Sequence, residues 1–343
     1  MEGDDASGAG SPPAPLYSGA SRRDEKSCVS LRHQLFRKIN NFRAFHSTRS
    51  EVLQLRSARV SPRRAARLGV AVALVILGAT ACRGGGRIVL PVALDEPAPA
   101  LHYPADFGSH EAVVRGVATL LASDLRLPVP DHITVYIYSS RAVFERGLIS
   151  DGRLPEVRAA ELSEFAVGVG KRRQLLLHDS GGPPAAREWL RLIAHELTHV
   201  AQIELAQGEG RAEQWLAEGM AEWAAFRVLE RLGVDTLLER RAAAIGHVRE
   251  HPALREGRLD LEGLGTSRGF TVRHLREGSL ATYQLAFLMT DYLIRRQGFA
   301  SLPRYFRELA AGRTRHESFR SAFGQSLAEF EREMLDHLGQ VLR

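Results

Sequence analysis

Apolar residues recur at helical spacing over much of the chain. Between residues 186 and 206 they follow one another at intervals of three or four, which places them on one face of an α-helix. The same spacing predicts helices over residues 110–125, 141–148, 186–206, 213–231, 235–247, 280–297, 301–311, 316–322 and 326–341. Residues 207–214 and 248–279 show no such repeat, and we expect long loops there.

A period of two residues marks the expected strands. β-Branched and aromatic side chains alternate over Ile133–Tyr138, which is typical of a strand with one buried face. Phe165–Gly168 and Gln174–His178 are also strand-like, and the turn-prone Gly170–Arg173 separates them. Strands thus come first and helices follow, an order that predicts an α+β fold with a helical C-terminal part.

The first eighty residues differ in composition from the rest. Residues 1–59 are rich in Ser, Arg, Gly and Pro without a sustained apolar repeat, so we expect a disordered leader or a stretch upstream of the true start of translation. Basic residues then precede an apolar run, Leu68–Ala81, which ends at Cys82. This pattern predicts a bacterial lipoprotein signal peptide over residues 60–81, with the cysteine acylated after cleavage.

The signal predicts an exported protein, held to a membrane by lipid on Cys82 and facing the periplasm or the cell exterior. Residues 82–100 are expected to be a Gly- and Pro-rich tether, and residues 101–343 the folded domain. The alternative to a cleaved signal peptide is a signal anchor that spans the membrane once. If translation starts at Val60, residues 1–59 are not part of the protein. Lipoprotein sites usually have Leu three residues before the cysteine, whereas this chain has Ala79.

The excess of basic charge lies in the leader and signal. Residues 1–81 carry 13 of the 46 Lys and Arg residues but only 6 of the 40 Asp and Glu residues, which leaves 33 basic and 34 acidic side chains in the remainder. The high isoelectric point therefore does not indicate nucleic-acid binding by the folded domain. Cys28 and Cys82 both precede that domain, so we expect no disulfide within it.

The strongest chemical signal is His-Glu-Leu-Thr-His at residues 195–199. Because His195 and His199 lie one turn apart on the same face of a helix, both imidazoles can bind one metal ion. Glu196 points about 100° around the helix and can reach a water molecule on that metal. Apolar neighbours indicate that the histidines are buried and need partners. The spacing is that of a zinc hydrolase helix, and an ordinary buried histidine is the alternative for either residue alone.

The next predicted helix supplies a third ligand. A catalytic zinc site takes three protein ligands and leaves one position open. Eighteen residues separate His199 from Glu218, which is enough for one helix to end, a loop to turn and a second helix to pack back. Glu222, one turn later on the same face, is placed to accept the outer N–H of a ligand histidine. A solvated helix glutamate is the alternative for both acids.

These residues resemble the gluzincin metallopeptidases, and within them the bacterial peptidase MA-like family. The resemblance extends over roughly residues 101–343 but is specific only between Trp189 and Trp223. It implies a thermolysin-like catalytic domain, in which a small mixed sheet covers the active-site helix and its edge strand runs along the cleft. A substrate peptide can add to such an edge as a further strand, and Gln174–His178 is the candidate.

The resemblance also implies roles for the motif residues. His195, His199 and Glu218 would hold one Zn²⁺ per chain, and Glu196 would act as general base toward a metal-activated water that hydrolyses a peptide bond. The substrate would be a peptide or a protein. Thermolysin-like enzymes usually have Asp as the outer acid, and Glu222 is one methylene longer.

Family members have a tyrosine in the helix that corresponds to residues 280–297. The resemblance therefore implies Tyr283 as a neutral donor to the oxyanion, with a packing tyrosine as the alternative. His247, His251 and His274 are rival donors. Their spacing favours none of them, and we expect each on the surface.

Two other classes of function stay open. In the first, the chain is a non-catalytic zinc-binding surface lipoprotein that acts as a binding or scaffolding module. In the second, it is a helical domain in which the His-Glu-x-x-His motif is coincidental. Glu196 favours the enzyme over the scaffold, because a purely structural zinc site needs no base. A cysteine nucleophile is not indicated, since Cys28 and Cys82 both precede the folded domain.

Overall fold

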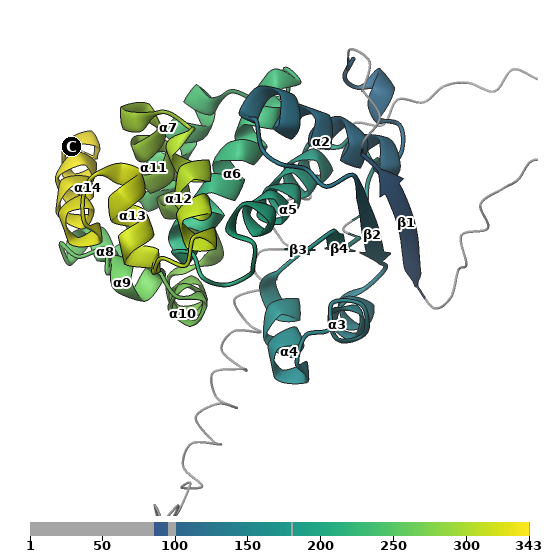
Figure 1. Cartoon of the computed structure of the whole chain (residues 1–343), viewed down its shortest axis with the longest axis horizontal. Coiled ribbons are helices and arrows are strands. Elements are labelled where there is room, and N and C mark those ends of the chain that lie inside the picture. Colours follow the sequence, from purple (N-terminus) through teal and green to yellow (C-terminus); the bar gives the residue numbers. More distant parts are fainter. Residues whose placement is uncertain (1–85, 95–100, 180, 343) are drawn as a thin grey trace, which may run out of the picture. The chain divides into compact units, whose positions relative to one another are not determined.

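The computed structural model describes residues 86–94, 101–179 and 181–342, which form an α+β fold with one small mixed sheet (Figure 1). Its strands are β1 (Arg87–Ala93), β2 (His132–Tyr138), β3 (Gly168–Lys171) and β4 (Gln174–His178). Its helices are η2 (Ala105–Phe107), α2 (His110–Leu125), α3 (Arg141–Ser150), α4 (Glu156–Phe165), α5 (Arg187–Ala206), α6 (Gln214–Arg231), α7 (Leu237–Val248), α8 (Pro252–Arg255), α9 (Leu261–Leu264), α10 (Ser267–Glu277), α11 (Ser279–Gln297), α12 (Ser301–Ala310), α13 (Arg315–Phe323) and α14 (Leu327–Val341).

The predicted leader, signal peptide and acylated Cys82 lie outside the described residues. Strand β1 falls inside the stretch 82–100 that we predicted as a tether, and the sequence pattern missed it. The strand forms because it pairs antiparallel with β2 along its whole length, from Arg87 opposite Tyr138 to Ala93 opposite His132. Residues 88–93 are all apolar and include Pro91, so no alternation of apolar and polar residues identifies the strand.

The sheet has the strand order β1-β2-β4-β3, with β2 and β4 parallel and the outer pairs antiparallel. Strand β4 is therefore interior, and Gln174–His178 as the edge strand of the cleft is wrong. Its central leucines, Leu175–Leu177, are all fully buried, as is typical of a strand covered on both faces. The edge strands are β1 and β3, and β3 is the one that packs against α5. The predicted strand at Phe165–Gly168 is also wrong, since Phe165 is the last residue of α4 and β3 begins at Gly168.

Alternate residues of β4 enter two different cores. Leu175 and Leu177 belong to the main core with α2 and α5, whereas Leu176 packs in a smaller cluster with Tyr138 and Phe144. Figure 1 shows the corresponding layers, with α2 and α5 on one face of the sheet and α3 and α4 on the other.

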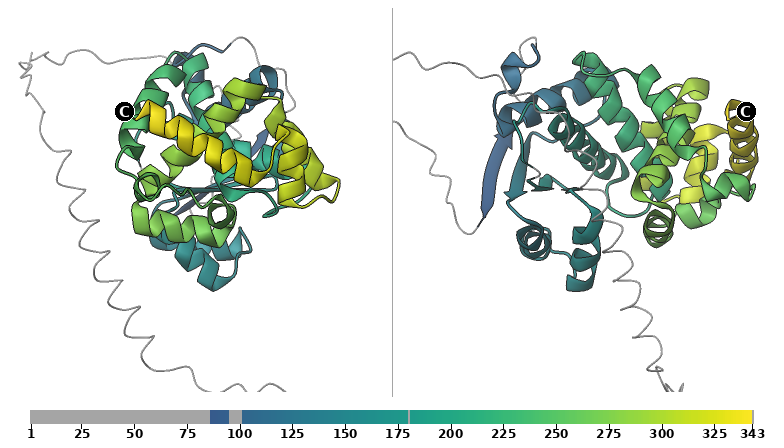
Figure 2. Two further views of the ribbon diagram at one scale, coloured as in Figure 1. Left: turned by 90° about the vertical axis from the view of Figure 1, so that its left-hand side faces the viewer. Right: turned by 180° about the vertical axis from the view of Figure 1, so that it is seen from behind.

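Helix α5 lies at the centre of the main core. It packs against α6, α2, α12 and strand β3, and fourteen of its twenty residues are buried. Helices α11 to α14 lie on the side of α5 and α6 that faces away from the sheet, as the right-hand view of Figure 2 shows. Glycine at position 219 allows α11 to approach α6, because a Cβ there would lie 2.3 Å from the carbonyl oxygen of Ala286.

Three stretches differ from the prediction. Helix α4 was not predicted, since its apolar residues form no regular stripe. The expected loop 248–279 contains α8, α9 and α10, of which the first two are four residues long and the third is rich in arginine. The expected turn Gly170–Arg173 is shorter, because Gly170 and Lys171 belong to β3.

Candidate metal centre

Helix α5 brings two histidines to one point. His195 and His199 lie one turn apart, their rings meet edge to face with centroids 4.8 Å apart, and their Nε2 atoms are 3.1 Å apart. Their side chains are only 10% and 18% exposed. The helical spacing of the motif thus places two buried nitrogen atoms in one space, as predicted.

The following helix adds a carboxylate. Helix α5 ends where Gln207 adopts the left-handed conformation, and α6 begins at Gln214 and packs against α5. Glu218 on α6 directs Oε2 at both histidines, 3.2 Å from His195 Nε2 and 3.5 Å from His199 Nε2. Its other oxygen accepts a hydrogen bond of 2.8 Å from the side chain of Gln214, which fixes the orientation of the carboxylate.

The three atoms fit a tetrahedral metal ion. Ligand atoms about 2.0–2.1 Å from such an ion are about 3.3–3.4 Å from one another. The sides of the triangle formed by His195 Nε2, His199 Nε2 and Glu218 Oε2 are 3.1, 3.2 and 3.5 Å. Within the described residues Glu218 Oε2 is buried without a hydrogen-bond partner, which a cation would supply. The group could therefore hold a metal ion.

The outer nitrogen of each histidine faces an oxygen. His195 Nδ1 lies 3.4 Å from Glu222, which also pairs with Arg191, and His199 Nδ1 lies 2.9 Å from Gln202 Oε1. These acceptors favour a proton on Nδ1 and leave Nε2 available as a ligand atom. Glu222 thus lies where we predicted it. Arg191 and Gln202 were missed, although their positions four before and three after a histidine place them on the same helix face.

In the metal site, neighbouring groups of opposite charge outweigh the effect of burial on the pKa values of His195 and Glu218. Burial would lower the pKa of His195, but the carboxylates of Glu218 and Glu222 outweigh it and raise this pKa to about 10. Burial would raise the pKa of Glu218, and the two histidines outweigh it and hold this pKa well below its usual range. The carboxylates therefore provide negative charge that favours a cation, and protons compete with that cation for the histidines.

Strand β3 packs against α5 beside Glu196. The backbone N–H of Gly170 donates a hydrogen bond of 2.6 Å to the Glu196 carboxylate. A Cβ at Gly170 would lie 2.3 Å from the Glu196 carbonyl oxygen, so only glycine permits this approach. Burial raises the pKa of Glu196, which suits a group that must accept a proton near neutral pH.

Tyr283 on α11 lies beside the same group. Its ring centroid lies 6.2 Å from that of His195, and its ring also contacts Phe270 and His274 edge to face. Burial, followed by the charges of nearby carboxylates, raises the pKa of Tyr283 well above its ordinary value, so the phenol remains a neutral donor. It lines one cleft together with His195, His199, Glu196 and Glu218.

Of the three rival histidines, only His247 is exposed. The expectation of a surface position is wrong for His251 and His274, which are 2% and 5% exposed, because helices α8 and α10 form where we expected a loop. His274 lines the cleft beside Tyr283, so it remains close to the metal group.

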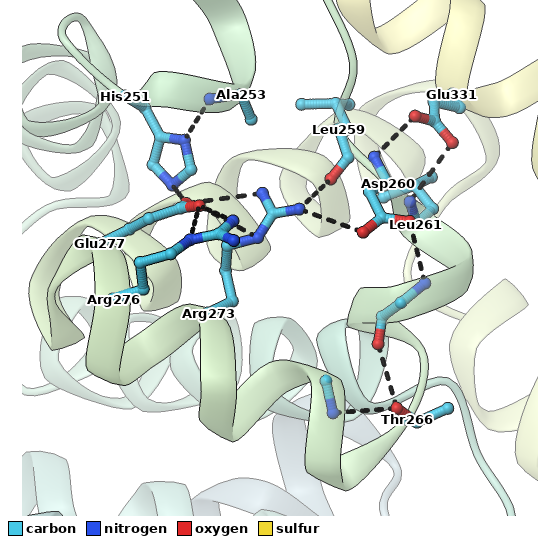
Figure 3. Close-up of polar contacts among 12 residues, drawn as sticks. His251, Ala253, Leu259, Asp260, Leu261, Thr266, Arg273, Arg276, Glu277 and Glu331 are labelled. Carbon is cyan, nitrogen blue, oxygen red and sulfur yellow. Dashed lines mark hydrogen bonds and ion pairs between the residues drawn. The ribbon is translucent and has the colours of Figure 1, made fainter. Parts of the chain in front are cut away.

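A buried polar cluster fixes α10, which forms one wall of the cleft (Figure 3). Glu277 at the end of α10 lies 3.0 Å from His251 Nε2 and 3.2 Å from Arg273 Nε. Arg273 also donates to the Leu259 carbonyl oxygen, and Glu331 of α14 accepts from the backbone N–H of Asp260. Hydrogen bonds and ion pairs among α8, α9, α10 and α14 thus hold α10 in place.

Comparison with models of protein families, with curated proteins and with solved structures found no match. Among the described residues, no helix is long and apolar enough to cross a membrane. The assignment of chemistry therefore depends on the geometry of the site.

Proposed function

We propose that this chain is a zinc-dependent metallopeptidase of the gluzincin type, with one Zn²⁺ held by His195, His199 and Glu218. The observation that carries the proposal is the triangle of ligand atoms, whose sides of 3.1, 3.2 and 3.5 Å match a tetrahedral site. Two nitrogen atoms and one carboxylate oxygen leave a fourth position for water or substrate, which is typical of catalytic rather than structural zinc.

The zinc ion, when bound, lowers the pKa of a water molecule and polarises a carbonyl group. The other steps belong to the chain. Glu196, held by the N–H of Gly170, takes a proton from water and passes it to the leaving amine. Tyr283 donates to the oxyanion that develops on the carbonyl oxygen.

Strand β3 is the element suited to align a peptide. It is an edge of the sheet, and Gly168, Val169 and Gly170 line the cleft. The Val167 carbonyl accepts a hydrogen bond from His178 of β4, whereas the N–H of Gly170 points to Glu196. Because backbone groups alternate along a strand, the N–H and C=O of Gly168 and the C=O of Gly170 face away from β4, where an extended peptide can add.

The full-length chain tests the proposal. We expect about one zinc ion per chain by metal analysis, hydrolysis of a degenerate peptide pool, loss of that hydrolysis with a chelator and its return when zinc is added. Glu218→Gln should lose zinc, whereas Glu209→Gln, an exposed acid of the preceding loop, should retain it. A chain that binds no zinc, or hydrolysis that a chelator leaves unchanged, contradicts the proposal.

Export and lipid attachment through Cys82 are part of the proposal and rest on the sequence from Arg63 to Cys82.

A further inference from the structure

The cleft has two walls that meet at one place. Helix α4 and strand β3 form one wall, and α10 presents Ser267, Phe270, Thr271 and His274 from the other. The walls touch through the rings of Phe165 and His274, whose centroids lie 4.5 Å apart. Phe165 comes only three residues before Gly168, so this contact lies at the start of the edge strand.

The opposite end of the cleft is formed by the loop that follows α5. Lys171 at the end of β3 lies 3.9 Å from Glu209 of this loop, and Gly208 and Gly210 beside it carry no side chain. The N-terminus of α10 lies at the same end, because Ser267 donates a hydrogen bond of 2.8 Å to Gln214. The two ends of the cleft therefore differ, with a glycine-rich loop at one and an aromatic contact at the other.

The aromatic contact lies next to the metal group. His274 packs against Tyr283, which in turn packs against His195. Two residues, Ala166 and Val167, separate Phe165 from Gly168 at the start of β3. A peptide that continues its pairing along this stretch, at about 3.3 Å per residue, therefore extends about two residues beyond Gly168 before it meets the contact. Antiparallel pairing, the more stable arrangement, directs the C-terminal end of that peptide toward the contact.

One polar atom at this end has no partner. Nδ1 of His274 is buried and makes no hydrogen bond within the described part of the chain. A buried polar group without a partner is costly, and a ligand that supplies an acceptor would satisfy it. A terminal carboxylate is such an acceptor, and the rings of Phe165 and Phe270 offer apolar surface to the residue that bears it.

We infer that the Phe165–His274 contact ends the substrate path on the carboxyl side of the scissile bond, so that the enzyme removes one or two residues from the free C-terminus of a peptide. This inference rests on the proposed peptidase function and adds the substrate class. Phe165 is the specificity-determining residue, and His274 holds the terminal carboxylate.

Product analysis by mass spectrometry tests the cleavage position. The probes are pools of N-terminally labelled decapeptides that end in Phe or Leu, with matched pools whose C-terminus is fused to a small folded protein. The wild-type chain should shorten the free peptides by one or two residues at the C-terminus and cut the fused pool at least about tenfold more slowly. Internal cleavage of both pools at equal rates, or removal of N-terminal residues, would overturn the inference and leave a zinc peptidase in place.

Opening the contact should change the products. Phe165→Ala, and His274→Ala from the opposite wall, should raise cleavage of the fused pool at least about tenfold relative to the free pool. Val167→Ala, an exposed position outside the cleft, should leave the ratio unchanged. An unchanged ratio in both opened variants would show that the contact does not limit the path.

Binding separates this inference from the proposed chemistry. In the Glu196→Gln background, fluorescence anisotropy should show at least about tenfold weaker binding of the fused than of the free peptides, and Phe165→Ala should remove the difference. Discrimination in binding without hydrolysis by the wild-type chain would contradict the peptidase function alone. Equal binding of both pools would overturn the inference.

Discussion

Two glycines set the distance between strand β3 and helix α5. A Cβ at Gly168 would meet the side-chain atoms of Glu196 and Leu192, which can move, whereas a Cβ at Gly170 would meet the backbone of α5. The position of the Glu196 carboxylate therefore depends on the absence of a side chain at residue 170.

Gly170→Ala should displace β3 from α5. We expect a loss of about 1–3 kcal/mol in the free energy of unfolding, typical of overpacking, together with reduced hydrolysis because Glu196 loses its backbone donor. Urea denaturation and peptide hydrolysis measure the two effects. Gly108→Ala is the matched control, since nothing lies within 4 Å of its Cβ. Wild-type stability and turnover in Gly170→Ala would contradict the close packing of strand and helix.

Tyr283→Phe should retain zinc and lower turnover on the order of 10²–10³-fold, the effect of removing one oxyanion donor. The ring and its packing against Phe270 remain, so the thermal midpoint should change little. Metal analysis, thermal unfolding and steady-state kinetics of the same preparation measure the zinc content, the thermal midpoint and the turnover. Wild-type turnover in this variant would remove Tyr283 from the mechanism.

Helical spacing was sufficient to predict the two histidines of the metal group. Positions four apart on one helix must share a face, which brings His195 and His199 together whatever the rest of the fold. Glu218 and Glu222 followed from the assumption that the next helix packs back on α5. The burial of His251 and His274 could not be predicted in this way, because it depends on helices that charge pairs hold in place.

Among the elements, long helices were predictable and short pieces were not. Helices α5, α12 and α14 have apolar stripes that identify them from sequence, and α6 is long and buried on nearly all faces. Strand β3 has two glycines in four residues, and residues 88–93 of β1 are all apolar, so neither has the alternation that marks a strand. The edge of the sheet was misplaced for the same reason, since the apolar strand β4 was easier to recognise than β3.

The pairing of α8 with α10 should depend on pH through His251. Its Nδ1 accepts from Ala253, its Nε2 faces Glu277, and Arg273, Arg276 and Glu256 surround it. Burial is the largest effect and lowers the pKa of His251 below its ordinary value of 6.5. The unfolded chain therefore binds this proton more readily, and the free energy of unfolding should fall as the pH drops below about 6.5.

His251→Asn tests this contribution. Asparagine retains an acceptor at the N-cap of α8 but does not titrate, so the stability of the variant should fall less steeply between pH 6.5 and 5, by at most about 1.4 kcal/mol per pH unit. Urea denaturation at a series of pH values, with saturating zinc, measures how the free energy of unfolding of each chain changes with pH. His247→Asn, at an exposed position of α7, should retain the wild-type slope. Equal slopes for all three chains would show that His251 titrates alike in the folded and unfolded states.

For the whole molecule, the proposed attachment to a membrane depends on one residue. The two or three acyl chains of a bacterial lipoprotein suffice for stable anchoring, at about 0.8 kcal/mol per buried CH₂. Cys82→Ser should therefore leave the chain unprocessed or move it to the soluble fraction. Cell fractionation and mass spectrometry of the membrane form measure this. An unmodified Cys82 with the apolar run still attached would indicate a single-span anchor instead, and the metal centre would be unaffected.

The most direct test of the central claim is the rate of peptide hydrolysis by Glu196→Gln at measured, equal zinc occupancy. The change retains the shape of the side chain and leaves His195, His199 and Glu218 in place, so zinc content should equal that of the wild type. Glu188→Gln, at an exposed position of the same helix, is the matched control and should retain full activity. We predict that Glu196→Gln binds one zinc ion per chain and loses almost all hydrolysis, because the chain then lacks its general base. Hydrolysis at the wild-type rate with zinc bound would contradict the account.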